Sequence, residues 1–203
     1  MSHPERRPWV SPWWQAINLP DRWDVCGVIV PSLSVWHVFA LENIGNAFVV
    51  GGVPTMDDVQ GLLLIASRDM QGGRRLLSHD RHRARMTRRM YLRLRKADES
   101  DAITACREYV SECMRHGHRM STAGVSGTPA GSPEPWAIVA VLAGLMDWQA
   151  AWNAPYAVGR AALDAHDERN GNTTMTPWSY GEEMHDNWEW WEQQTETREV
   201  SLN

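Results

Sequence analysis

Two helices and a break between them are indicated by Leu33-Ser-Val-Trp-His-Val-Phe-Ala-Leu-Glu-Asn-Ile-Gly-Asn-Ala-Phe48, then Val49-Val-Gly-Gly-Val-Pro54, then Thr55-Met-Asp-Asp-Val-Gln-Gly-Leu-Leu-Leu-Ile-Ala-Ser67. In the first part, apolar residues recur at steps of three and four, which is typical of a single buried helix face. These residues are Leu33, Trp36, Ala40, Ile44 and Phe48, with His37 and Leu41 widening the same stripe. We expect one helix over this part, with His37 at the edge of the core.

The second helix is expected to begin at Thr55. Glycines 51 and 52 and Pro54 interrupt regular structure before it, and Thr55 is a favourable N-cap with Asp57 and Asp58 in the first turn. Its apolar residues share one face, while Leu64 and Ile65 make the end of the helix apolar almost all round. The pattern places this helix at the centre of the core.

Bulk composition limits the class of protein. A chain of 203 residues with 43% hydrophobic and 22% charged residues is typical of a globular protein of one or two domains. A net charge of -5 gives no general attraction to nucleic acid or anionic membrane. The longest apolar run, residues 136–146, is shorter than the roughly 20 residues that cross a bilayer. With no secretory signal pattern at the N-terminus and an odd number of cysteines, three, we expect a cytoplasmic protein without a disulfide framework.

Tryptophan is unusually frequent, with 12 residues against two phenylalanines. Tryptophans are enriched at interfaces, but they also fill cores, and composition does not distinguish the two uses. Residues 1–31 combine prolines with tryptophans such as Trp13 and Trp14, which suits an extended arm. The arm either wraps its own domain or reaches a partner, and residues 25–30 could form one short strand within it.

Residues 32–118 are expected to form an N-terminal helical domain. After a break at Gly72 and Gly73, ten basic residues lie between Arg74 and Lys96, opposed only by Asp80. A narrow stripe of Met86, Met90 and Leu94 predicts a helix that lies along the body with its arginines outward. Its hypothetical basic face consists of Arg81, Arg85, Arg88 and Arg89. An amphipathic helix follows over residues 99–116, with Ile103, Cys106, Val110 and Cys113 on its buried stripe.

Residues 119–135 resemble a flexible linker, and residues 136–203 are expected to form a C-terminal helical segment. Residues 136–148 are apolar on all sides and should be buried. Asn153 can cap a helix that ends near Gly171, and a last helix opens at Thr176, with an acidic surface and Trp178, Trp188 and Trp191 on one face. The whole chain is therefore predicted to be all-α, an irregular multi-helix bundle of about six to seven helices with an extended Pro/Trp-rich N-terminal arm.

No catalytic constellation stands out. The chain lacks a GxSxG elbow, a phosphate-binding P-loop and an HExxH helix. A metal site of Cys106, Cys113 and His116 is conceivable, but both cysteines fall on the core stripe, which favours buried thiols. We expect no catalytic residue, metal or cofactor. The basic helix could bind nucleic acid, although the acidic balance argues against it; it could also pair with the acidic last helix, within the chain or between subunits, or be a solvated face.

Two segments carry a family resemblance. The 33–67 module, together with Met146-Asp-Trp-Gln149, Trp152-Asn-Ala-Pro-Tyr-Ala-Val158 and Ala161-Ala-Leu-Asp-Ala-His-Asp-Glu-Arg-Asn-Gly171, resembles helical tail assembly chaperones and related small tail-module proteins of long-tailed bacteriophages and prophages. The resemblance covers about a third of the chain; the arm, the arginine-rich helix and the linker depart from it.

The resemblance implies a non-enzymatic protein of the host bacterial cytoplasm that keeps a helical client, the tape-measure protein, soluble until the tail tube forms. Its expected partners are that client or other tail-module proteins, with a homo-oligomer left open and no membrane. The hypothetical partner-binding residues are Trp13, Trp14, Trp178, Trp188 and Trp191. The alternatives are a structural tail or baseplate component, which would be found in the virion, and an arginine-helix nucleic-acid-binding protein.

Overall fold

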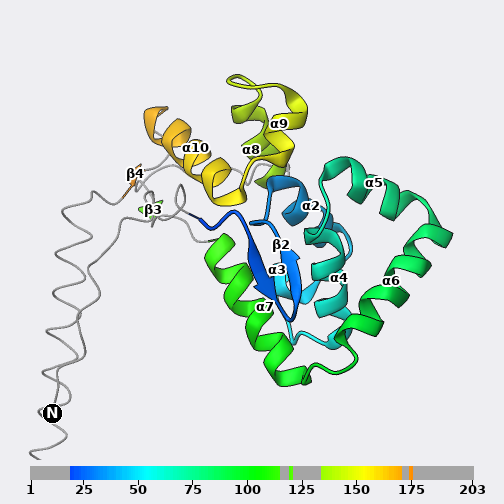
Figure 1. The fold of residues 1–203 in the computed structure, drawn as a ribbon. Coiled ribbons are helices and arrows are strands. Elements are labelled where there is room, and N and C mark those ends of the chain that lie inside the picture. The colour runs from blue at the N-terminus through cyan, green and yellow to red at the C-terminus, as the bar shows by residue number, and fades with distance from the viewer. Residues whose placement is uncertain (1–18, 115–118, 121–133, 171–173, 176–203) are drawn as a thin grey trace, which may run out of the picture.

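The computed structural model describes residues 19–114, 119–120, 134–170 and 174–175. Within these residues the chain forms nine helices and two small two-stranded sheets, so the all-α, multi-helix prediction is confirmed (Figure 1). None of the helices in these ranges combines the length and apolar character needed to cross a bilayer.

A β-hairpin opens the described part of the chain. Strands β1 (Trp23–Val25) and β2 (Val28–Val30) pair antiparallel around Cys26 and Gly27, whose φ angles of 55° and 76° give a two-residue turn that matches strand twist. Val25, Val28 and Val30 are buried. The sequence suggested one strand over residues 25–30 in an extended arm; instead the turn divides this segment, and the hairpin packs into the core.

The module after the hairpin contains three helices, α2 (Val35–Asn43), α3 (Ala47–Val50) and α4 (Met56–Ala66). The first helix was expected to continue to Phe48, but it ends because Gly45 adopts a φ of 68°. This bend turns Ile44 outward, to 47% exposure, and its predicted burial is wrong. Helix α4 begins at its Thr55 cap as predicted, and Leu64 and Ile65 are buried.

Helices α5 (Met70–Ser78) and α6 (Asp80–Leu94) carry the arginines. The predicted break at Gly72 and Gly73 is wrong, since α5 runs through both glycines and the break falls at His79. The reason is close packing: a Cβ atom on Gly73 would lie 2.7 Å from the indole Nε1 of Trp36. The glycine lets α5 approach α2, with no need for a turn.

Helix α7 (Glu99–Cys113) follows the predicted stripe, with Cys106 and Cys113 fully buried and Ile103 half-buried. Its Tyr109 hydroxyl donates to the Pro31 carbonyl at 2.6 Å, which fastens the helix to the end of the hairpin. Gly117, where the helix was expected to stop, lies outside the described residues.

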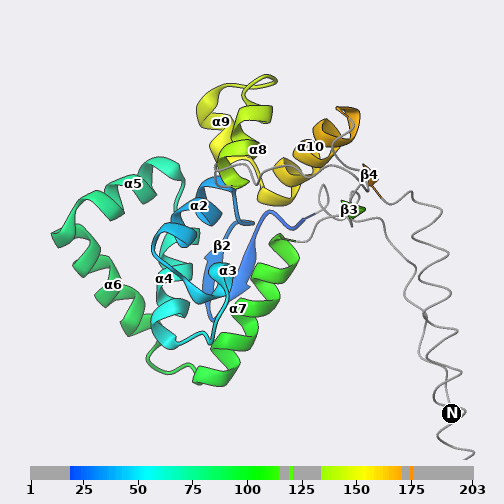
Figure 2. The same cartoon turned by 180° about the vertical axis from the view of Figure 1, so that it is seen from behind.

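Helices α8 (Glu134–Leu142), α9 (Trp148–Asn153) and α10 (Tyr156–Arg169) form one end of the molecule, next to α2 (Figures 1 and 2). Two-residue strands β3 (Arg119–Met120) and β4 (Thr174–Met175) pair on the α10 side, away from α5 and α6. Residues of α8, α9 and α10 share one apolar core with the hairpin and helices α2 to α7.

The C-terminal helices differ from the prediction in two ways. Residues 136–148 were expected to be a buried helix, but α8 ends at Leu142 and an exposed turn follows. Asn153 was expected to cap α10; it is the last residue of α9, and its Oδ1 accepts from the Met70 amide of α5 at 3.1 Å. The first amide of α10, that of Tyr156, instead donates to the Leu33 carbonyl at 2.8 Å.

Candidate interaction surfaces

An aromatic cluster joins α2, α8 and α9. Trp152 packs against Phe39 with ring centroids 5.3 Å apart and against Trp136 at 5.2 Å, and Trp136 contacts Trp148 at 5.6 Å. One side of the cluster is buried and the other is exposed to solvent: Trp152 is 4% exposed, whereas Trp136 and Trp148 are 42% and 49% exposed. The two outer indoles therefore rest on an ordered apolar base and face solvent.

The turn between α8 and α9 extends this exposed area. Leu145 is 79% exposed and Met146 is 40% exposed. The turn is fixed by the Leu145 and Met146 amides, which donate to the Leu142 carbonyl, and by Asp147, whose Oδ1 accepts from the first turn of α9. We call Trp136, Leu145, Met146 and Trp148 the aromatic surface. Contiguous exposed apolar side chains of this kind mark interaction sites.

Sequence reasoning missed the aromatic surface because it read the whole apolar run as one buried helix. A local signal was present: Gly144 followed by Asp147 is a stop and then a new N-cap. Given that signal, the apolar residues between the two helices fall in a turn, where most side chains are exposed.

An ion-pair network holds α8 to α10; Arg160 and Asp164 are buried, whereas Glu134 is partly exposed. The Arg160 guanidinium pairs with Glu134 and, at 3.1 Å, with Asp164, while the Tyr156 hydroxyl donates to Glu134. Burial opposes the charge of Arg160, but the hydrogen bond and charge of Glu134 outweigh it and raise the pKa. Burial, with the charge of Glu134, also raises the pKa of Glu42. The network fixes the start of α8, two residues before Trp136.

A second surface lies on α5 and α6. Arg81, Arg85, Arg88 and Arg89 are all exposed on α6, with Met90 and Leu94 buried beneath, as the amphipathic pattern predicted. We call these four arginines the basic surface. Asp80 is the one carboxylate within α6, and it pairs with Arg83 at 2.6 Å, so the helix itself carries a large excess of positive charge.

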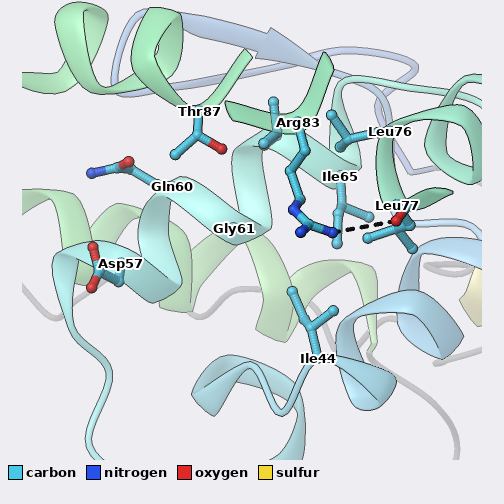
Figure 3. A pocket seen from close by; sticks show the side chains of 10 residues that line it. Ile44, Asp57, Gln60, Gly61, Ile65, Leu76, Leu77, Arg83 and Thr87 are labelled. Carbon is cyan, nitrogen blue, oxygen red and sulfur yellow. Dashed lines mark hydrogen bonds between the residues drawn. The ribbon is translucent and has the colours of Figure 1, made fainter. Parts of the chain in front are cut away.

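A cavity of about 380 Å³ lies between α4, α5 and α6 (Figure 3). Its walls are mainly aliphatic, with Arg83 and a few polar groups at the edge. The Arg83 side chain extends along it and donates to the Leu77 carbonyl at 3.3 Å (Figure 3). The lining residues are Ile44, Asp57, Gln60, Gly61, Leu64, Ile65, Leu76, Leu77, Arg83 and Thr87.

The two buried cysteines of α7 are uncharged. Burial raises the pKa of Cys106 to about 12 and that of Cys113 to about 11, so both are protonated thiols at neutral pH. No group of three or more metal-ligating side chains gathers in the described ranges, and His116, the third residue of the conceivable metal site, lies outside them.

His37 is a buried part of a helix cap. Its Nδ1 accepts from the Ser34 amide at 2.9 Å, and its Nε2 bonds the Arg68 carbonyl, which requires a neutral ring with the proton on Nε2. Burial lowers its pKa. These contacts support the interpretation of His37 as a core histidine.

The structure describes only some of the predicted site residues. Trp13, Trp14, Trp178, Trp188 and Trp191 lie outside the described residues, whereas the four arginines lie together on α6. Comparison of the chain with protein-family models, with curated proteins and with solved structures found no match.

Proposed function

We propose that this protein is a non-enzymatic tail assembly protein of a bacteriophage or prophage, which binds a helical client such as a tape-measure protein through the aromatic surface. The observation that carries this proposal is the exposure of Trp136, Leu145, Met146 and Trp148 around one turn. A client helix that covered these side chains would gain roughly 25 cal/mol for each Å² of apolar area removed from water.

The geometry of the aromatic surface suits a helix. Its two outer indoles have centroids 5.6 Å apart, which is close to the spacing of about 5–6 Å between side chains at positions i and i+4 of a helix. Trp152 and Phe39 support the indoles from below, so little side-chain freedom is lost on binding. Asp147 lies between Met146 and Trp148, and its charge favours basic residues beside the apolar stripe of the client.

The choice of client rests on the sequence resemblance to tail assembly chaperones. One of the two resembling segments begins at Met146 and includes Trp148 and Trp152, so it overlaps the aromatic surface. Covering a long apolar client until the tail tube forms requires a reusable apolar face and no catalysed reaction. Such a protein acts in the host bacterial cytoplasm.

The test is binding to the tape-measure protein of the same genome, measured by calorimetry with the full chain. Trp136→Ala combined with Trp148→Ala should weaken binding by more than tenfold and leave the helical circular dichroism unchanged. The matched control is Tyr91→Ala combined with Leu92→Ala, because these residues are 56% and 50% exposed on α6 and lie outside the aromatic surface. Equal losses in both variants, or unchanged binding in the tryptophan variant, would refute the role of this surface.

The exposed arginines of α6 favour a second candidate, nucleic-acid binding. Affinity for duplex DNA or RNA should then fall steeply with salt and disappear in the Arg81→Glu, Arg85→Glu, Arg88→Glu variant. Finding the chain in purified virions by mass spectrometry would instead favour a structural tail or baseplate component.

A further inference from the structure

The core-facing side of α6 changes character along the helix. Met90 and Leu94 lie on this side and are buried, at 5% and 2% exposure. Thr87 and Arg83 continue the same side toward the start of the helix, at the steps of three and four residues that place side chains on one face. Both line the cavity between α4, α5 and α6, which we call the α4–α6 cavity. Polar side chains therefore occupy the part of the stripe that lies over a cavity instead of the packed core.

The facing walls of the α4–α6 cavity are mainly aliphatic. Leu64 and Ile65 of α4 and Leu76 of α5 line it, and Ile44 borders it from the α2–α3 loop (Figure 3). Its volume of about 380 Å³ falls within the range of small-molecule sites. An apolar cavity of about 150 Å³ is enough to hold benzene, so this one has room for a ligand of about two fused rings.

Arg83 supplies a cation inside these apolar surroundings. Its side chain extends along the cavity, where Nη1 donates to the Leu77 carbonyl at 3.3 Å and Nη2 donates to Asp80 at 2.6 Å (Figure 3). A guanidinium has five N–H donors, so these two bonds leave others for a ligand. The Asp80 side chain is 87% exposed, and solvent weakens such a surface ion pair. A carboxylate within the cavity would meet the same cation in less polar surroundings, where their attraction is stronger.

We propose that the α4–α6 cavity binds a small hydrophobic carboxylate, with its apolar part against the aliphatic walls and its carboxylate on Arg83. An anion suits the cavity better than a cation, because Asp57 is exposed at the end away from Arg83, where solvent weakens its attraction for a cation (Figure 3). The charge of Asp57 also directs the carboxylate of the ligand toward Arg83. The proposal is independent of client binding, because the aromatic surface of α8 and α9 takes no part in it.

Calorimetry with the full chain at neutral pH tests this site with two matched probes. One probe is 2-naphthoate, and the other is 2-naphthalenemethanol, which has the same rings and no charge. The naphthoate should bind roughly tenfold more tightly than the alcohol, because it adds charge-assisted hydrogen bonds to Arg83. In Arg83→Met, which keeps an unbranched apolar side chain, the two probes should bind with affinities within about twofold of each other.

Three further variants locate the bound probe. Thr87→Trp, which fills the cavity without changing charge, should weaken both probes by roughly tenfold or more, with the helical circular dichroism unchanged. Arg88→Met removes an exposed arginine from the opposite side of α6 and should leave both affinities unchanged. Trp136→Ala combined with Trp148→Ala should also leave them unchanged, because the aromatic surface is a separate apolar area.

The site is wrong if naphthoate shows no saturable binding or if the wild type binds the two probes equally. Retention of the naphthoate preference in Arg83→Met would overturn the role of that guanidinium. Loss of naphthoate binding in the variant of Trp136 and Trp148, with binding kept in Thr87→Trp, would place the probe on the aromatic surface and overturn the proposal. Client binding by the aromatic surface is measured separately, so each proposal can fail without the other.

Discussion

Replacement of Gly73 by alanine tests the close approach of α5 to α2. In an exposed helix interior this change stabilises by about 1 kcal/mol, because alanine is the better helix former. Here the new Cβ would lie 2.7 Å from Nε1 of Trp36 and 3.1 Å from its Cε2 and Cζ2. Trp36 is only 7% exposed and packs against Phe39, so the indole has little room to move. Overpacking of a core costs about 1–3 kcal/mol.

The clash should exceed the gain in helix propensity, and we expect a net loss of about 1–2 kcal/mol in the free energy of unfolding. For a chain of this length, that corresponds to a fall in Tm of roughly 2–8 °C. Urea unfolding followed by far-ultraviolet circular dichroism measures it. A double-mutant cycle with Trp36→Phe isolates the contact, because phenylalanine lacks the Nε1 and Cζ2 atoms that the methyl group would meet.

In the Trp36→Phe background, Gly73→Ala should cost much less or become stabilising. The reasoning fails if Gly73→Ala stabilises the wild-type chain by about 1 kcal/mol. It also fails if the cost is the same in both backgrounds, because the destabilisation would then come from somewhere other than the indole.

Three other substitutions probe buried polar groups. Burial holds the pKa of His37 below the 6.5 of the unfolded chain, so the unfolded state takes up the proton first as the pH falls. The free energy of unfolding should therefore be highest above pH 6.5 and decrease as the pH drops below it. His37→Gln, which preserves a capping box with Ser34, should lose part of this pH dependence in urea titrations at several pH values. Arg160→Met removes the cation that faces the buried Asp164 carboxylate, and it should lower the free energy of unfolding in urea by about 3 kcal/mol or more. Unchanged stability would contradict this expectation. Tyr109→Phe should cost about 1–2 kcal/mol, because the Pro31 carbonyl loses its donor while the ring contact with Trp23 is kept; a loss above 3 kcal/mol would point to disturbed packing instead.

The parts of the fold that the sequence predicted well are those set by local signals. Helix α4 starts at Thr55 because the Thr55 and Asp58 side chains bond each other's backbone amides, and both residues are visible in the sequence. The outward arginines of α6 follow from the three-residue apolar stripe beneath them in the same way.

Where the prediction was wrong, a distant partner decided the outcome. Gly72 and Gly73 suggest a break until Trp36, more than thirty residues away, explains why a helix needs glycine there. Asn153 suggests a cap for the next helix, yet its side chain accepts the Met70 amide at the start of α5, 83 residues earlier in the chain. The exposed tryptophans of α8 and α9 were missed for a different reason, because hydrophobicity alone does not separate a buried apolar run from two short helices joined by an apolar turn.

The junction at Asn153 also relates the two surfaces. Helix α9 carries Trp148 and Trp152 of the aromatic cluster, and its last side chain accepts the amide of Met70, where α5 begins. Arg68, which precedes the N-cap of α5, Asp69, accepts a hydrogen bond from His37 of α2 at its carbonyl, and α2 also supplies Phe39 to the cluster. The base of the aromatic surface and the start of the basic helices are thus held by the same small set of contacts. A client that orders α9 would therefore also order the beginning of α5, and the α4–α6 cavity lies against the other end of that helix.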